Sequence, residues 1–181
     1  MIAETRAAKI RLLIMDVDGV LTSGQILFGS EGEVIKVFHT QDGLGISTAH
    51  RAGLKTAIIT GRDTKMVACR CAELAIGDLY QGAQDKAGIL AELADKHGIS
   101  CEEMAYVGDD LNDLAIMTQV GLACAVANAV TEVKAVAHYI ASRSGGDGAV
   151  REVIELILKA QGKWDKVVAA YARPGGFAAR Q

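Results

Sequence analysis

The chain has 181 residues, half of them hydrophobic, and a formal net charge of −3 at pH 7. This length predicts one domain, with enough apolar side chains for a core that needs no disulfides. The slightly negative charge excludes the basic surface of a nucleic-acid-binding or membrane-surface protein, and no apolar run approaches the roughly 20 residues of a transmembrane helix. The first residues lack a signal peptide's apolar core, and the four cysteines lack zinc-type spacing. We therefore expect a cytoplasmic protein with reduced thiols.

The first predicted strand is the apolar run from Ile10 to Met15, interrupted only by Arg11, as in a strand buried on both faces of a parallel sheet. Asp16 and Asp18 follow at once and point to the same side if the extended conformation continues. Acids at the carboxyl end of such a strand favour a site for a hard cation and for phosphate chemistry. A calcium loop needs a preceding helix and another acid before its Gly. Simple loop-capping acids remain the alternative at this point.

A β-hairpin is predicted next, from two β-prone runs at 25–28 and 34–39 that are separated by the turn-rich segment 29–33. The hairpin carries more apolar surface than an isolated hairpin can leave in water. We therefore expect it to pack on something, such as another copy of the chain.

Helices and strands alternate through the rest of the chain. Helices are predicted over 40–52, 63–74, 86–97, from 113 to 120, over 131–137 and over 148–160, and strands over 54–59, 78–81, 104–107, 122–126 and 138–141. Ser100 and Glu103 form a capping-box pattern before a short turn. This alternation predicts an α/β fold with a doubly wound, Rossmann-like parallel sheet. We expect a single domain over 1–164, with the hairpin inserted at about 25–39, and a C-terminal tail over 165–181 without regular structure.

Four polar signatures fall at consecutive strand ends or helix starts. They are Asp16 with Asp18, Thr60, Lys86, and Asp109 with Asp113. Because parallel strands bring their carboxyl ends to one edge of the sheet, we expect these side chains to meet there. Taken singly, Thr60 could be a helix cap, Lys86 a solvated helix residue, and the later acids a favourable helix N-terminus; their joint order favours a site.

Phosphate-monoester hydrolysis fits this set of residues. Asp16 can act as the nucleophile and form an aspartyl-phosphate, while Asp18 protonates the leaving oxygen and then deprotonates the attacking water. Mg²⁺ takes oxygen ligands and keeps several waters, so Asp16, Asp109 and a phosphate oxygen would hold it. Thr60 and Lys86 would bind the remaining phosphate oxygens.

These motifs resemble those of the haloacid dehalogenase superfamily, in order and over most of the chain. The matching segments are D-V-D-G-V-L-T (16–22), I-T-G-R (59–62), Lys86 and G-D-D-L-N-D (108–113). The spacings between them leave room for a hairpin, single helices and one short strand, but for no lid domain. The chain is therefore identified as a member of the capless branch, with a haloacid dehalogenase type of sheet and no cap domain.

Within that branch, three further segments are similar to the 3-deoxy-D-manno-octulosonate 8-phosphate phosphatase family: 38–46, 79–82 and 145–153. The resemblance implies Asp16 as nucleophile, Asp18 as acid/base, and Mg²⁺ on Asp16, Asp109 and the Asp18 carbonyl. It also implies a homotetramer whose hairpins associate and whose neighbouring subunits complete the site, and a role in lipopolysaccharide precursor synthesis. The substrate-binding residues that it implies are Asp18, His39, Thr40, Gln41, Asp42, Gly43, Arg62, Arg70 and Lys86.

The chain departs from that family at Gln41 and Ser47, where members carry Arg, the preferred partner of a sugar carboxylate or phosphate. A phosphatase for a nonulosonate 9-phosphate or another small phosphate ester is the alternative enzyme. A phosphoacceptor receiver also combines acids, Thr and Lys on such a sheet. However, a receiver phosphorylates a later Asp and has no use for an acid/base such as Asp18. A non-catalytic tetramerisation module would not need Asp16 and Asp18.

Overall fold

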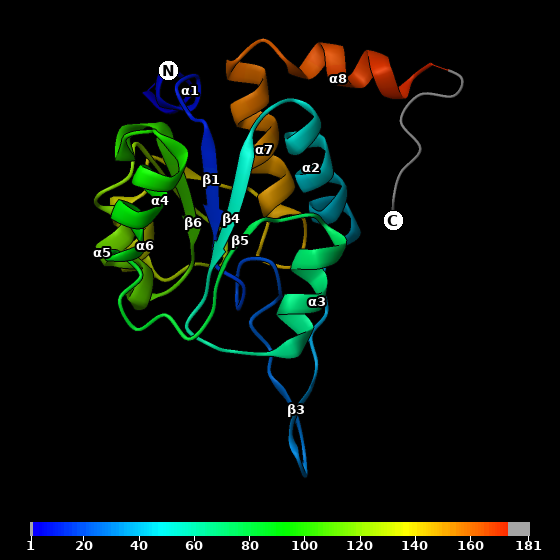
Figure 1. The fold of residues 1–181 in the computed structure, drawn as a ribbon, viewed down its shortest axis with the longest axis vertical. Helices are drawn as coiled ribbons and strands as arrows, with labels where there is room; N and C mark the ends of the chain where they lie inside the picture. The colour runs from blue at the N-terminus through cyan, green and yellow to red at the C-terminus, as the bar shows by residue number, and fades with distance from the viewer. Residues whose placement is uncertain (1, 174–181) are drawn as a thin grey trace.

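The computed structural model describes residues 2–173 and contains a six-stranded parallel sheet (Figure 1). The strand order is β5-β4-β1-β6-β7-β8. The strands are β1 (Leu12–Met15), β4 (Lys55–Ile59), β5 (Asp78–Tyr80), β6 (Met104–Gly108), β7 (Leu122–Ala125) and β8 (Tyr139–Ile140). The predicted doubly wound sheet is confirmed, with β1 near its centre.

The register of the central strands places the predicted site at one edge. All four residues of β1 are fully buried, as expected for a strand covered on both faces. Met15 lies opposite Ile58 of β4 on one side and Val107 of β6 on the other. The residues that follow these three strands therefore leave the sheet side by side.

Helices cover both faces of the sheet. In Figure 1, α2, α3 and α7 lie on one side and α4, α5 and α6 on the other. Their bounds, with those of the first and last helices, are α1 (Ile2–Ala7), α2 (Thr40–Arg51), α3 (Lys65–Glu73), α4 (Ile89–His97), α5 (Leu114–Met117), α6 (Thr131–Val136), α7 (Ala149–Ala160) and α8 (Trp164–Tyr171). Short 3₁₀ turns, η1 (Cys101–Glu103) and η2 (Leu111–Asp113), flank β6. Among these helices, none is long and apolar enough to cross a membrane.

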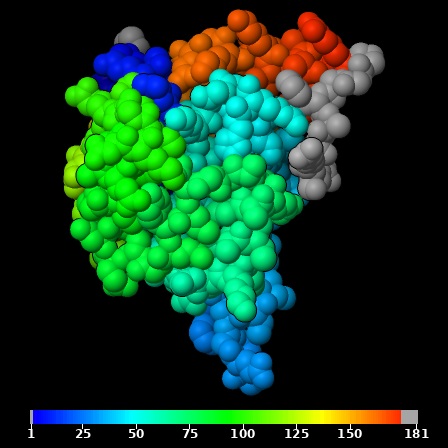
Figure 2. Space-filling model, in the orientation of Figure 1, coloured from blue at the N-terminus to red at the C-terminus, as the bar shows by residue number. Residues whose placement is uncertain are grey.

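The hairpin forms a second, antiparallel sheet of β2 (Leu27–Gly29) and β3 (Gly32–Ile35). It projects from the body on the side toward which β1 runs (Figures 1 and 2). Its large apolar side chains are exposed: Ile26, Leu27, Phe28, Val34, Ile35 and Val37. The hairpin prediction is confirmed, and no described part of this chain covers its apolar side chains.

Two predicted helix boundaries are wrong. The helix expected from residue 86 begins only at Ile89, because the Asp85 carboxylate accepts from the Gly88 N–H at 3.0 Å and stabilises a turn there. Lys86 is consequently free to turn into the protein, where it is only 4 % exposed. The helix expected up to Val120 ends at Met117. Gly98 ends α4 in the left-handed conformation.

The expectation of no regular structure beyond Trp164 is wrong over α8. The Tyr171 hydroxyl lies 3.2 Å from the Thr48 hydroxyl of α2, and Arg151 of α7 stacks on the Trp164 ring at 5.2 Å. These tertiary contacts stabilise a helix too short to be stable alone. The sequence analysis also missed α1. The rest of the predicted tail, 174–181, lies outside the described residues.

Candidate active site

Asp16 and Lys86 meet at the carboxyl end of β1, as predicted. The Lys86 ammonium donates to Asp16 Oδ2 at 2.6 Å and to Asp113 Oδ1 at 2.7 Å. The Val17 N–H donates to Asp16 Oδ1 at 2.6 Å, so both oxygens of this carboxylate are oriented. Asp16, Lys86 and Asp113 are each less than 5 % exposed. Such buried charges are tolerated only because they compensate one another.

Asp113 connects Lys86, Tyr106 and the loop after β6 through hydrogen bonds. Its Oδ1 also accepts from the Tyr106 hydroxyl at 2.7 Å, and its Oδ2 accepts from the N–H groups of Asp109 and Asp110 at 2.8 and 3.3 Å. Because both oxygens are occupied, Asp113 supports Lys86 and the loop after β6. The residue was part of a predicted motif, but its partner Tyr106 was missed.

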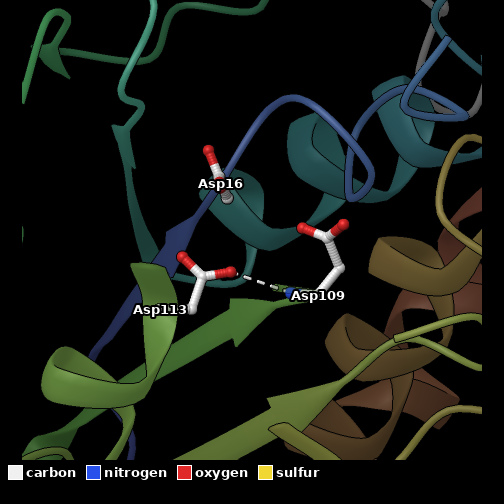
Figure 3. A group of neighbouring side chains, drawn as sticks. All are labelled: Asp16, Asp109 and Asp113. Atoms are coloured by element: carbon white, nitrogen blue, oxygen red, sulfur yellow. Dashed lines mark hydrogen bonds between the residues drawn. The ribbon is translucent and has the colours of Figure 1, made fainter. Parts of the chain in front are cut away.

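Asp16, Asp109 and Asp113 form a carboxylate cluster that fits a divalent cation (Figure 3). One ligand atom of each lies within 4.8 Å of the others. Asp109 Oδ1 is buried without a hydrogen-bond partner, and a cation would satisfy it. Since the oxygens of Asp113 are engaged, Asp16 and Asp109 are the residues that would hold Mg²⁺, a hard cation that prefers such oxygen ligands. The Asp18 carbonyl stays a predicted third ligand.

The protonation of this cluster follows from its burial. Burial raises the pKa of Asp109 to about 7, and the charges of Asp113 and Asp16 add to this shift. Burial also raises the pKa of Asp16 to about 6, although the charge of Lys86 opposes the increase. Burial alone would lower the pKa of Lys86, but its two carboxylate partners outweigh it and raise the value. At neutral pH, Asp16 is therefore mainly ionised and suited to nucleophilic attack.

We expect the affinity for Mg²⁺ to rise by at least about 10²-fold between pH of about 5 and pH of about 8. Because both carboxyl pKa values are raised from the ordinary 3.8 in the folded protein, the metal-free form loses stability as the pH rises from 3.8 to about 6 for Asp16 and to about 7 for Asp109. Mg²⁺ binds the ionised form and restores that stability. Calorimetric titration across this range measures the affinity, with Asp109→Asn as the low-affinity control; a pH-independent dissociation constant contradicts the prediction.

The loop after β1 is closely packed on the cation site. Gly19 has a φ of +89°, and a Cβ there would collide with the Asp109 carboxylate. The segment 145–148 packs against this loop, since the Gly146 N–H donates to the Val20 carbonyl at 3.0 Å. Thr60, at the end of β4, is buried at 1 % exposure next to β1. Thr60 therefore leaves the sheet beside Asp16.

Asp18 lies at the base of the hairpin. Its Oδ1 pairs with the Lys36 ammonium, and its Oδ2 lies 3.9 Å from Arg62 Nε. Arg62 also donates to Glu33 of the hairpin at 3.0 Å. The structure thus brings the predicted residues Asp18 and Arg62 together. The sequence analysis missed Lys36 and Glu33, although two opposite charges three residues apart, on either side of Val34 and Ile35, were a usable signal.

The remaining predicted substrate contacts lie around the start of α2. His39 is the N-cap of α2 and lies 3.9 Å from Asp147, whereas Thr40 and Gln41 are exposed. Asp42 is buried and accepts from the Arg151 N–H at 2.7 Å, so it joins α2 to α7. A substrate contact by Asp42 stays a prediction.

Arg70 approaches the same segment from α3. A Cβ on Gly43 would collide with the Arg70 guanidinium, which stacks on the Phe38 ring at 5.6 Å. Thr40 and Arg70 line a cavity of about 550 Å³ whose wall includes Lys36. Because Lys36 also pairs with Asp18, this cavity adjoins the predicted acid/base.

Comparison with known proteins places this geometry in a family. Residues 72–154 match a family model of haloacid dehalogenase-like hydrolases. The 3-deoxy-D-manno-octulosonate 8-phosphate phosphatase of Salmonella typhi is 49 % identical over 162 residues, 90 % of this chain and 86 % of that protein. The chain belongs to the haloacid dehalogenase superfamily.

Solved structures of the same kind superimpose closely. The phosphatase of that name from Moraxella catarrhalis, in complex with magnesium ion, phosphate ion and KDO, has a TM-score of 0.91 at 45 % identity, covering 93 % of this chain and 97 % of that one. The cobalt-bound enzyme of Haemophilus influenzae has a TM-score of 0.88 at 38 % identity, covering 95 % and 98 %. The predicted superfamily and capless fold are confirmed.

Proposed function

We propose that this chain is a Mg²⁺-dependent phosphatase that hydrolyses 3-deoxy-D-manno-octulosonate 8-phosphate to the free sugar and phosphate. The observation that carries the reaction class is the meeting of Asp16 and Asp109 at the ends of the adjacent parallel strands β1 and β6, with the buried Lys86 ammonium donating to Asp16. The substrate follows from 49 % identity to phosphatases of that name. We infer the same place in lipopolysaccharide precursor synthesis, in the cytoplasm, where the four free cysteines would stay reduced.

The mechanism divides one difficult step into two. An Asp16 carboxylate oxygen attacks phosphorus, the bond from phosphorus to the sugar oxygen breaks, and protonated Asp18 gives its proton to that oxygen. Asp18 then removes a proton from water, which attacks the aspartyl-phosphate and regenerates Asp16. Lys86 neutralises negative charge next to Asp16 throughout. Bound Mg²⁺ supplies positive charge for the phosphate oxygens.

The surroundings of Gln41 support an acidic substrate despite the departure at that position. Arg143 donates to Gln41 Oε1 at 2.6 Å, so a guanidinium lies where the resemblance leads us to expect one. Arg is the preferred partner of a carboxylate because its donors form a planar fork. We propose that Arg143 replaces part of the charge absent at Gln41, whereas Ser47 has no such neighbour among the contacts described.

Mg²⁺-dependent phosphate release from a panel of esters tests the substrate. The panel contains 3-deoxy-D-manno-octulosonate 8-phosphate, a nonulosonate 9-phosphate and several neutral sugar phosphates. We expect the highest kcat/KM for the first, and Arg143→Met should reduce that preference more than it reduces hydrolysis of the neutral esters. A preference for the nonulosonate ester overturns the substrate but keeps the mechanism. No release from any ester overturns the enzyme and favours a receiver or a tetramerisation module.

We further propose a homotetramer assembled through the hairpins. Phe28 of β2 and Val37 just after β3 are 69 % and 66 % exposed, and the other large apolar residues of the hairpin are between 42 % and 55 % exposed. An apolar surface of this kind on a projecting element is typical of an interaction site. The hairpin of another copy has the matching apolar surface, because each copy presents the same side chains.

Phe28→Asp is expected to convert the assembly into smaller species, because a carboxylate in the apolar contact would be desolvated without a partner. Light scattering coupled to size exclusion gives the mass, which should be four times that of one chain in the wild type. The control is Ile2→Asp, which changes an equally exposed apolar residue on α1. A wild type that is monomeric, or a Phe28→Asp variant that keeps its mass, contradicts the proposal.

A further inference from the structure

Two charged residues of the hairpin point inward while their apolar neighbours face solvent. Val34 and Ile35 are 55 % and 53 % exposed, whereas the side chains of Glu33 and Lys36 are only 6 % and 1 % exposed. Burying an ammonium group costs free energy unless a specific partner compensates it. The buried position of Lys36 therefore needs a structural or chemical reason.

Lys36 pairs with Asp18, which lies in the catalytic loop, the loop after β1. The Lys36 ammonium donates to Asp18 Oδ1. Asp18 Oδ2 is buried and has no hydrogen-bond partner, and Arg62 Nε lies 3.9 Å from it. One oxygen of this carboxyl group is therefore held and the other is left for a different partner.

Glu33 forms ion pairs with both Lys36 and Arg62. Its Oε1 lies 2.8 Å from the Lys36 ammonium, and its Oε2 accepts from Arg62 at 3.0 Å. Burial raises the pKa of Glu33, but its hydrogen bonds with Lys36 and Arg62 outweigh this and keep the pKa below the ordinary value. We call Asp18, Glu33, Lys36 and Arg62 the hairpin charge ring. It contains two carboxylates and two cations, and it connects the hairpin to the catalytic loop.

We propose that Lys36, held in place by Glu33, is a positioning residue that orients the Asp18 carboxyl group so that Oδ2 faces the leaving oxygen of the substrate. This inference rests on the proposed role of Asp18 as acid/base. An ammonium group only donates hydrogen bonds. Asp18 Oδ1 accepts such a bond from Lys36 and therefore cannot carry a proton that points toward Lys36. The proton that Asp18 delivers is therefore carried on Oδ2, the oxygen without a partner.

The reactivity of the leaving group separates this role from a merely structural one. An alkyl ester such as a sugar phosphate needs its leaving oxygen protonated, whereas p-nitrophenyl phosphate releases a stable phenolate without a proton. The ratio kcat/KM reports the steps up to phosphoryl transfer, in which Asp18 acts as the acid. Loss of orientation at Asp18 must therefore lower kcat/KM for the alkyl ester much more than for the aryl ester.

Lys36→Met and Glu33→Gln are the test variants, and Glu31→Gln, an exposed change in the same hairpin, is the matched control. We expect Lys36→Met to lower kcat/KM for the sugar phosphate about 10²-fold while p-nitrophenyl phosphate changes less than about 3-fold. Glu33→Gln should shift the ratio of the two in the same direction, and Glu31→Gln should leave it unchanged. Glu33→Gln also serves as the test if Lys36→Met does not fold.

Two results with the variants would overturn the proposal while the proposed function stands. An equal loss on both esters, with a raised KM, would mean that Lys36 binds the phosphate directly. Unchanged kcat/KM on both would mean that Asp18 needs no orientation by the ring. The wild-type enzyme provides the separate check of the proposed function: if it releases phosphate only from another alkyl ester, the sugar is revised and that ester takes its place in the comparison. If it hydrolyses no alkyl ester, Asp18 has no acid role and the proposal fails together with the function.

Discussion

Asp16→Asn is expected to lower phosphate release by about 10⁵-fold or more while leaving the fold intact. The amide cannot form an aspartyl-phosphate, so the covalent route is lost. The fold should survive because Asn removes a carboxylate whose ionisation is opposed by burial, and because Lys86 keeps Asp113 at 2.7 Å. Phosphate release and thermal unfolding are measured together. The control is Asp95→Asn, on the exposed side of α4, which should retain wild-type activity.

The covalent intermediate gives a second readout of the same prediction. Wild-type protein quenched in acid during turnover should carry an acid-stable, base-labile phosphoryl group on the peptide that contains Asp16. The Asp16→Asn protein should carry none. Residual turnover near the wild-type rate, or phosphate found on Asp109 instead, would contradict the assignment and favour a receiver-like chemistry.

The parts of this protein that the sequence predicted best are those determined by local pattern. The run before Asp16 is apolar on both faces, so it had to lie inside the sheet, and the order of strands and helices required parallel pairing. Parallel pairing alone then brings Asp16 and Asp109 to one edge. The meeting of these two acids at one edge was therefore predictable before any contact was known.

What escaped prediction depends on contacts between distant segments. Lys36 is buried because the chain passes next to Asp18 as it returns from the hairpin. The hydrophobic pattern of residues 25–39 does not indicate that this contact forms. Tyr106 faces Asp113 from the strand, where an aromatic residue is indistinguishable from ordinary core. α8 is stabilised by packing on α2 and α7, so its own eight residues gave too weak a signal. In each case tertiary contacts outweigh local preference.

Lys86→Met is expected to destabilise the metal-free protein by about 3–5 kcal/mol. Methionine keeps an unbranched side chain but leaves Asp16 and Asp113, which lie 2.6 and 2.7 Å from the ammonium, without their buried cation. Phosphate release should fall by about 10³-fold, since the donor beside the transferred phosphoryl group is lost. Urea unfolding measures the stability. The control is Lys159→Met, which breaks an ion pair whose lysine is 55 % exposed and should cost less than about 1 kcal/mol.

Magnesium makes the prediction specific to this site. Among the described residues, Lys86 is the one cation paired with Asp16 and Asp113. In the Lys86→Met variant a cation bound by Asp16 and Asp109 would take over this compensation, so added Mg²⁺ should raise its unfolding temperature more than it raises that of the wild type. A variant whose stability falls but does not respond to Mg²⁺ would show that Lys86 acts through packing alone. A variant as stable as the wild type would mean that the carboxylates are protonated in the metal-free protein. Lys86 is thus expected to act both as a structural counter-ion and as a donor in the reaction, because its buried ammonium contacts both Asp16, the proposed nucleophile, and Asp113, which supports the loop after β6.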